Sequence, residues 1–151
     1  MKNKVMVAID DSEFSNHALI WTLENLGPTI RDSPLVIFTA QPPVDVSYLY
    51  ASSWGTAELI KELIASQKKA AHKLLEKAIA TCTNYGISAE GKTEVGEPKV
   101  VICDAVDKLN IELLVVGSHG RGAVSRTFLG SVSSYCNHHA NCPVLVVRKT
   151  E

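Results

Sequence analysis

The chain of 151 residues is 46% hydrophobic and 21% charged, and its 15 basic and 16 acidic residues leave a formal net charge of −1. These values are typical of one folded domain with a sizeable core, so we interpret residues 1–151 as a single domain. The balanced charge provides no basic surface for nucleic acid, and no apolar run reaches the roughly 20 residues of a membrane helix. The N-terminal segment turns acidic at Asp10 and is not typical of a signal peptide. We therefore expect a cytoplasmic protein with a nuclear share, and neither a nucleic-acid nor a membrane partner.

The first quarter of the chain predicts a strand, a helix and a second strand. Residues 4–9 (KVMVAI) form an apolar run that favours a strand covered on both faces. Asp11 or Ser12 can cap the helix that follows, and the Gly-Pro pair at 27–28 ends it. A second buried strand is predicted over residues 35–39, and a long connection begins after it.

Helices and strands alternate over the rest of the chain. The predicted elements are helix 58–85, strand 88–95, helix 98–109, strand 113–116, helix 131–139 and strand 143–147. Strand 88–95 (SAEGKTEV) is polar and contains a glycine, which suits the edge of a sheet. Pro98 suits the first position of its helix. The alternation predicts an α/β fold with a parallel sheet.

A glycine-rich loop after strand 113–116 carries the strongest functional signal. Gly117 is followed by two residues and Gly120, and then by nine residues and the pair Gly130-Ser131, which opens a helix. Glycines let the backbone approach a ligand closely, and the first N–H groups of a helix point outward without internal partners. This arrangement favours an anion such as phosphate. It is neither the phosphate loop that ends in Gly-Lys-Ser/Thr nor the dinucleotide pattern Gly-x-Gly-x-x-Gly.

This glycine spacing resembles the nucleotide-binding pattern of the universal stress protein family. The segments VMVAIDDS, VGEP and VLVV resemble that family too, its plant members in particular, so that the likeness covers essentially the whole chain. The resemblance implies a Rossmann-like fold of the adenine nucleotide alpha hydrolase type, with a five-stranded parallel sheet in the order 3-2-1-4-5 and helices on both faces. It also implies ATP or AMP as the ligand and a role in the stress response.

With that order, the first and fourth strands are neighbours, so Asp10 and Gly117 lie at the same crevice, beyond the carboxyl ends of these strands. The resemblance gives Asp10 a contact with the ligand, through ribose hydroxyls or a metal ion such as Mg²⁺; alternatively, Asp10 only caps the first helix. The resemblance places the adenine against Ala8, Ile9, Phe38 and Thr39. The predicted loop residues of the site are Gly117, Ser118, His119, Gly120 and Arg121. The outer phosphates are expected at Gly130, Ser131, Val132 and Ser133, and Arg126 is a further candidate to neutralise their charge.

The residues favour binding over turnover. No paired base or nucleophile accompanies His119, and Asp10 is the only group that we can place to clamp a metal or position a nucleophile. A slow ATPase or adenylate-handling enzyme and a stress chaperone remain as alternatives. A phosphate-accepting receiver domain would need an aspartate at the end of a central strand, whereas strand 35–39 runs into Thr-Ala-Gln.

The last strand predicts a homodimer. Strand 143–147 has no charge before Arg148, and a bare apolar edge would aggregate unless a second copy pairs with it about a two-fold axis. The family resemblance implies such a dimer through the last strand; alternatively, the chain's own loops cover the edge.

We interpret the four cysteines as reduced, mostly buried thiols. The run CNHHANC at 136–142 lacks the usual spacing of a zinc site.

Overall fold

The computed structural model describes residues 3–45, 47, 57–119 and 129–149. They contain one five-stranded parallel sheet in the order β3-β2-β1-β4-β5, as the resemblance implies. The strands are β1 Val5–Ala8, β2 Leu35–Gln41, β3 Ala89–Val95, β4 Leu113–Gly117 and β5 Val144–Val147. The polar strand β3 lies at one edge, as predicted, and β5 lies at the other.

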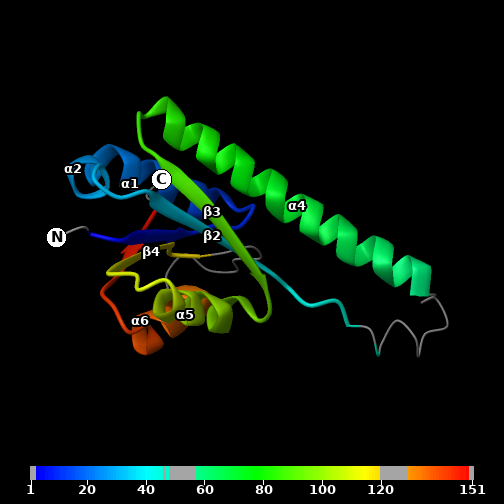
Figure 1. Cartoon of the computed structure of the whole chain (residues 1–151). Coiled ribbons are helices and arrows are strands. Elements are labelled where there is room, and N and C mark those ends of the chain that lie inside the picture. The colour runs from blue at the N-terminus through cyan, green and yellow to red at the C-terminus, as the bar shows by residue number, and fades with distance from the viewer. Residues whose placement is uncertain (1–2, 46, 48–56, 120–128, 150–151) are drawn as a thin grey trace.

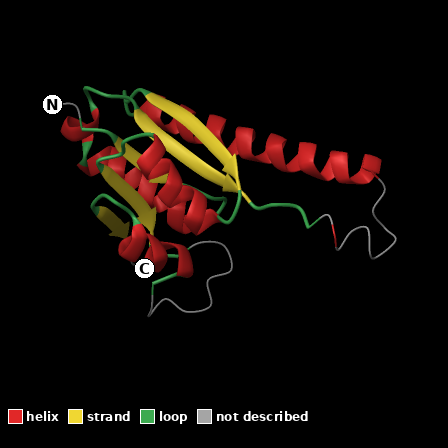
Figure 2. Ribbon diagram, turned by 60° about the horizontal axis from the view of Figure 1, so that its bottom comes forward, coloured by secondary structure: helices red, strands yellow, loops and turns green. Residues whose placement is uncertain are grey.

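Helices cover both faces of the sheet (Figures 1 and 2). The described helices are α1 Glu13–Asn25, α2 Gly27–Ile30, α4 Ala57–Asn84, α5 Pro98–Lys108 and α6 Ser131–His139. Helices α1, α2 and α4 pack on one face, and α5 and α6 pack on the other. The N-terminal half of α4 extends beyond the ends of the strands (Figure 1). None of the described helices is long and apolar enough to cross a membrane.

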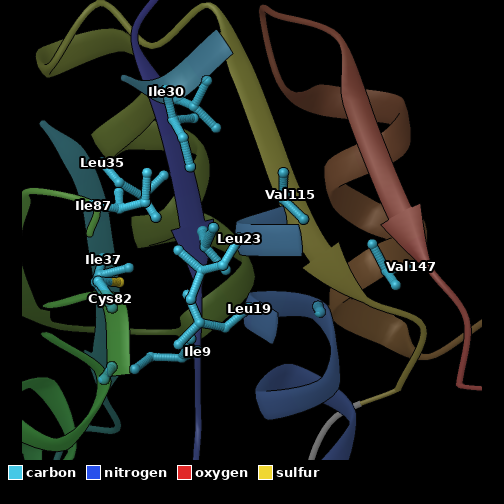
Figure 3. Close-up of a cluster of buried hydrophobic side chains, with 14 of the residues drawn as sticks. Ile9, Leu19, Leu23, Ile30, Leu35, Ile37, Cys82, Ile87, Val115 and Val147 are labelled. Carbon is cyan, nitrogen blue, oxygen red and sulfur yellow. The ribbon is translucent and has the colours of Figure 1, made fainter. Parts of the chain in front are cut away.

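Two apolar clusters form the core, one on each face of the sheet. Val5 and Val7 of β1 point into the cluster beneath α1 and α4, and Met6 points into the cluster beneath α5 and α6. Figure 3 shows the first cluster, which includes Leu19 of α1 and Ile37 of β2. Because successive side chains of a strand alternate between faces, a strand covered on both sides requires apolar residues in succession. This is why apolar runs predicted β1, β2 and β4.

Two boundaries differ from the sequence prediction. Strand β2 runs to Gln41, two residues beyond the predicted end, because it pairs with β3 over its whole length and the Gly96 N–H donates to the Gln41 carbonyl (2.9 Å). The pair Gly27-Pro28 ends α1 and also begins the short helix α2. A proline fits there because the first N–H groups of a helix have no acceptor within the helix, so the missing N–H costs no helical hydrogen bond. The predicted connection 40–56 lies largely outside the described residues.

All four cysteines are free thiols. Burial raises the pKa of Cys82 to about 11 and that of Cys136 to about 12, so both thiols stay protonated at neutral pH. His138 and His139 lie exposed on α6, whereas Cys136 on the same helix is buried. No group of three or more His, Cys, Asp or Glu side chains among the described residues is placed to hold a metal ion.

Gly117 lies where the end of β4 touches the first turn of α1. A Cβ atom on Gly117 would lie 2.9 Å from the carbonyl carbon and oxygen of Phe14 and 3.2 Å from the amide nitrogen of Ser15. Backbone atoms cannot rotate away as a flexible side chain can, so any side chain here displaces α1. The fold itself therefore requires a glycine at this position, whether or not a ligand is bound.

We expect Gly117→Ala to lower the free energy of unfolding by about 1–3 kcal/mol, because the added methyl group overpacks the contact between β4 and α1. Urea unfolding followed by circular dichroism measures this change. Gly27→Ala is the matched control, since a Cβ at Gly27 meets no atom within 4 Å. Equal stability of Gly117→Ala and the wild-type protein would contradict the close approach.

Candidate functional site

A cleft of about 700 Å³ opens where β1, β2 and β4 end. Strand β1 has β2 on one side and β4 on the other, so the cleft lies at the point where the winding of the sheet reverses, the usual ligand position in such folds. Its volume falls within the range of small-molecule sites. The cleft brings together most of the predicted site residues: Ala8, Ile9, Asp10, Thr39, Gly117, His119, Gly130, Ser131, Val132 and Ser133.

The remaining predicted residues lie elsewhere. Phe38, predicted to contact the adenine, is 1% exposed, belongs to the core cluster beneath α5 and α6, and does not line the cleft. Strand β2 runs on to Gln41, and its last three residues, Thr39, Ala40 and Gln41, line the cleft. Ser118 is buried behind the cleft wall. Gly120, Arg121 and Arg126 lie outside the described residues.

Ser118 fixes the start of α6. Its carbonyl oxygen accepts hydrogen bonds from the Gly130 N–H (2.7 Å) and the Ser133 hydroxyl (2.9 Å). We expected both of these donors to bind phosphate, but their protons are engaged within the protein. The contact joins the end of β4 to the first turn of α6 and brings that turn to the cleft.

Further donors at the N-terminus of α6 are backbone N–H groups of its first turn, among them those of its first two residues. Gly130 is the N-cap, with φ −66° and ψ 165°, and no side chain caps the helix. Ser131 is therefore the first helical residue and not the cap. Within the described part of the chain, the N–H groups of Ser131 and Val132 have no acceptor. Both residues line the cleft, so these N–H groups and the Ser131 hydroxyl are the donors available to an anion.

Asp10 supports the N-cap residue of α1 and lines the cleft at the same time. Its Oδ1 accepts from the Ser12 N–H (2.9 Å), also contacts the Ser12 hydroxyl, and lies 3.0 Å from the Ser15 hydroxyl. Ser12 is the N-cap of α1 and accepts from the Ser15 N–H (3.3 Å), as one of the two sequence alternatives predicted. These contacts hold the Asp10 carboxylate in a defined position in the cleft.

His119 is 8% exposed and has one unsatisfied nitrogen. Its Nδ1 lies 3.1 Å from the Ser118 hydroxyl, and its ring centroid lies 5.2 Å from that of Phe14. Its Nε2 is buried and has no hydrogen-bond partner in the described part of the protein. The contact with Ser118 resembles a base beside a nucleophile, but Ser118 is 3% exposed and does not line the cleft. A substrate in the cleft therefore does not reach this hydroxyl.

The side walls of the cleft come from two helices that no sequence motif marked as part of a site. Helix α4 contributes Gln67, Ala70, Ala71 and Leu74, and α5 contributes Pro98 and Ile102. Apolar residues recur along α4 at helical spacing, a pattern that indicates core packing and does not by itself indicate a cleft wall. The length of α4 was the available signal, because a helix of 28 residues is far longer than the strands on which it packs.

A chain of hydrogen bonds crosses the end of the sheet beside the cleft. The Thr39 hydroxyl donates to the Ile9 carbonyl (2.8 Å), and the Thr93 hydroxyl donates to the Thr39 carbonyl (2.7 Å). Gln41 Nε2 donates to the Thr93 hydroxyl oxygen (3.2 Å). The chain links β1, β2 and β3, and fixes the polar side chains that face the cleft from β2.

Comparisons with known proteins agree with this architecture. The sequence model of the universal stress protein family matches residues 1–148. The chain is 32% identical to the universal stress protein A-like protein of Arabidopsis thaliana over 161 residues, which cover 97% of this chain and 90% of the relative. It is 34% identical to universal stress protein Sll1388 of Synechocystis over 152 residues, covering 96% and 97%.

A solved structure shows the same fold. It is a universal stress protein family protein from Arabidopsis thaliana with AMP bound, which superposes with a TM-score of 0.72 at 28% identity and covers 98% of this chain and 92% of its own. The match over residues 1–148, the identity to two relatives along nearly their whole length and the shared sheet order lead to one conclusion. The chain belongs to the universal stress protein family.

Proposed function

We propose that this protein binds an adenine nucleotide, ATP or AMP, in the cleft at the ends of β1, β2 and β4, and acts as a nucleotide-dependent module of the stress response. The observation that carries the proposal is the first turn of α6, where the Ser131 and Val132 N–H groups face the cleft without acceptors in the described chain. The Arabidopsis relative with AMP bound supports the same ligand class.

The cleft offers a different environment at each end. The N-terminus of α6 supplies donors and a positive dipole end, which suit phosphate oxygens. Asp10 lies between the two ends, on the central strand side, where a carboxylate can accept hydrogen bonds from ribose hydroxyls. Ala71 and Leu74 of α4 and Ile102 of α5 give the other end apolar walls that suit a base.

A Mg²⁺ ion that accompanies ATP would use the carboxylates of this cleft. Asp10 and Asp11 both line it, and carboxylate oxygens are ligands that Mg²⁺ prefers. Mg²⁺ usually binds one or two carboxylates together with substrate phosphates and does not need a closed cage of protein ligands. A pair of aspartates beside the phosphates fits this preference. In this role the ion would neutralise phosphate charge.

We expect Gly130→Val to lose most affinity for ATP and AMP while the fold is retained. The φ of −66° and ψ of 165° at Gly130 are open to any residue, so valine adds bulk beside the phosphate donors without backbone strain. Isothermal titration calorimetry measures the affinity, and circular dichroism checks the fold. Gly27→Ala, which lies outside the cleft, should bind as the wild type does. Unchanged affinity in a folded Gly130→Val variant would remove this turn from the site.

We expect turnover of ATP with Mg²⁺ to stay well below about 1 per second, the lower end of the ordinary enzyme range. The reason is that the Ser118 hydroxyl beside His119 is buried away from the cleft, and the Ser15 hydroxyl beside the Asp10 carboxylate is buried and engaged in the hydrogen bonds that begin α1. Release of ADP from purified protein measures the rate, and Gly130→Val corrects for contaminating ATPases. A rate of 1 per second or more that the variant lacks would support the enzyme alternative.

We also propose a homodimer through β5. This strand ends the sheet, and Val144, Leu145 and Val146 remain partly exposed. The Leu114 N–H donates to the Pro143 carbonyl and the Ser118 N–H to the Val147 carbonyl, 3.0 Å in each case. Because a strand presents alternate residues to each neighbour, the N–H and carbonyl of Val146 point to the outer side. A second copy of β5 supplies partners for these groups.

Val146→Pro should convert the dimer to a monomer, because proline removes the outward N–H and leaves the ladder between β4 and β5 intact. Val146→Lys should act in the same direction by placing charge on the edge. Light scattering after size exclusion measures the mass at micromolar concentration. A monomeric wild type, or a dimer that persists in both folded variants, would exclude this edge as the interface.

A further inference from the structure

The side-chain amide of Gln41 is held in one orientation. Gln41 is 8% exposed at the end of β2, and its Nε2 donates to the Thr93 hydroxyl oxygen at 3.2 Å. The Thr93 hydroxyl donates its single proton to the Thr39 carbonyl at 2.7 Å. Thr93 can therefore only accept from Gln41. Exchanging the nitrogen and oxygen of the amide would place two acceptors against each other.

This orientation leaves the amide oxygen as the free polar atom of a side chain that lines the cleft. Gln41 lines the cleft, and within the described part of the chain its Oε1 accepts no hydrogen bond. Among the described side chains, the buried polar atom that lacks a partner is His119 Nε2, so Gln41 Oε1 is not sealed in the core. The cleft thus contains a hydrogen-bond acceptor whose position is fixed by the hydrogen bond between the Gln41 amide and Thr93.

A fixed acceptor distinguishes purines by their 6-substituent. Adenine carries an amino group at this position and can donate to Oε1, whereas hypoxanthine and guanine carry a carbonyl oxygen that cannot. A free glutamine would rotate its amide by 180° and offer a donor to the carbonyl instead. The hydrogen bond to Thr93 opposes that rotation, so an oxo-purine leaves two acceptors facing each other.

The position of Gln41 in the cleft suits contact with a base. Gln41 is the last residue of β2, while the phosphate donors of α6 come after β4, and β1 lies between these two strands. Two strand spacings separate these ends by about 10 Å, a distance comparable with the length of a nucleoside monophosphate. The apolar walls of α4 and α5 flank the same region of the cleft as Gln41.

The geometry points to Gln41 as the residue that selects 6-amino purines over 6-oxo purines, with Thr93 as its positioning residue. This assignment rests on the proposed binding of an adenine nucleotide and adds the group that distinguishes the base. It extends the site to a side chain on the outer half of the sheet, away from the glycine loop.

The test compares AMP with inosine monophosphate (IMP), which carries a carbonyl oxygen in place of the 6-amino group. Calorimetry gives both dissociation constants for the wild type, Gln41→Met and Thr93→Val. We expect the wild type to bind AMP at least about tenfold more tightly than IMP, which corresponds to one properly paired hydrogen bond. Gln41→Met keeps the side-chain length without polar atoms and should bring the ratio close to one.

Thr93→Val keeps the shape of threonine and frees the Gln41 amide to rotate. It should bind IMP more tightly than the wild type does and bind AMP about as well, a pattern that general loosening of the site would not produce. Thr83→Val is the matched control, because the Thr83 hydroxyl likewise donates to a backbone carbonyl, that of Ile79 on the exposed face of α4 (3.1 Å). It should keep the wild-type ratio.

The outcomes separate this assignment from the proposed function. If the wild type binds neither nucleotide, the proposed function fails and the role of Gln41 fails with it. If AMP binds but the ratio of AMP to IMP affinity is the same in the wild type and Thr93→Val, nucleotide binding stands and Gln41 does not select the base. Thr93→Val decides the question even where Gln41→Met fails to fold.

Discussion

The parallel pairing of β1 with β4 is the constraint on which the site depends. It places the end of β1, with Asp10, beside the end of β4, with Gly117, although the two lie more than a hundred residues apart in the chain. Strand β2 takes the other side of β1, so connections leave the sheet in opposite directions and a cleft remains between them. Helix α6 begins at this cleft because Ser118, directly after β4, accepts hydrogen bonds from its first residues.

Polar groups at the cleft divide into those that the fold uses and those that remain for a ligand. The Ser133, Thr39 and Thr93 hydroxyls all donate to backbone carbonyls, which joins α6 to β4 and the ends of three strands to one another. Such bonds consume donors that a motif alone would assign to the ligand. They also hold the remaining groups still, so the Ser131 N–H, the Val132 N–H and the Gln41 amide oxygen meet a ligand without first being reorganised.

The sequence was informative about elements and less so about their ends. Apolar runs predicted β1, β2 and β4 because strands covered on both faces can tolerate little else, whereas the sheet order came from the family resemblance and not from periodicity. The end of β2 was placed two residues early because a polar residue such as Gln41 is common in loops, and the predicted site included the buried Phe38 but not Gln41, which lines the cleft. Leu74 was missed for another reason, since an apolar side chain on a helix looks the same whether it faces a core or a cleft.

Two glycines of the same motif are required for different physical reasons. At Gly117 a methyl group would strike the backbone of α1, so the constraint lies within the fold. At Gly130 the backbone angles suit any residue, so the constraint that follows from the proposed function is the space that a phosphate would need beside the first turn of α6. A glycine spacing read from a sequence therefore combines a packing requirement with a binding requirement. A chain that lost its ligand during evolution would be free to replace Gly130 but not Gly117, so Gly130 carries more information about nucleotide binding than Gly117 does.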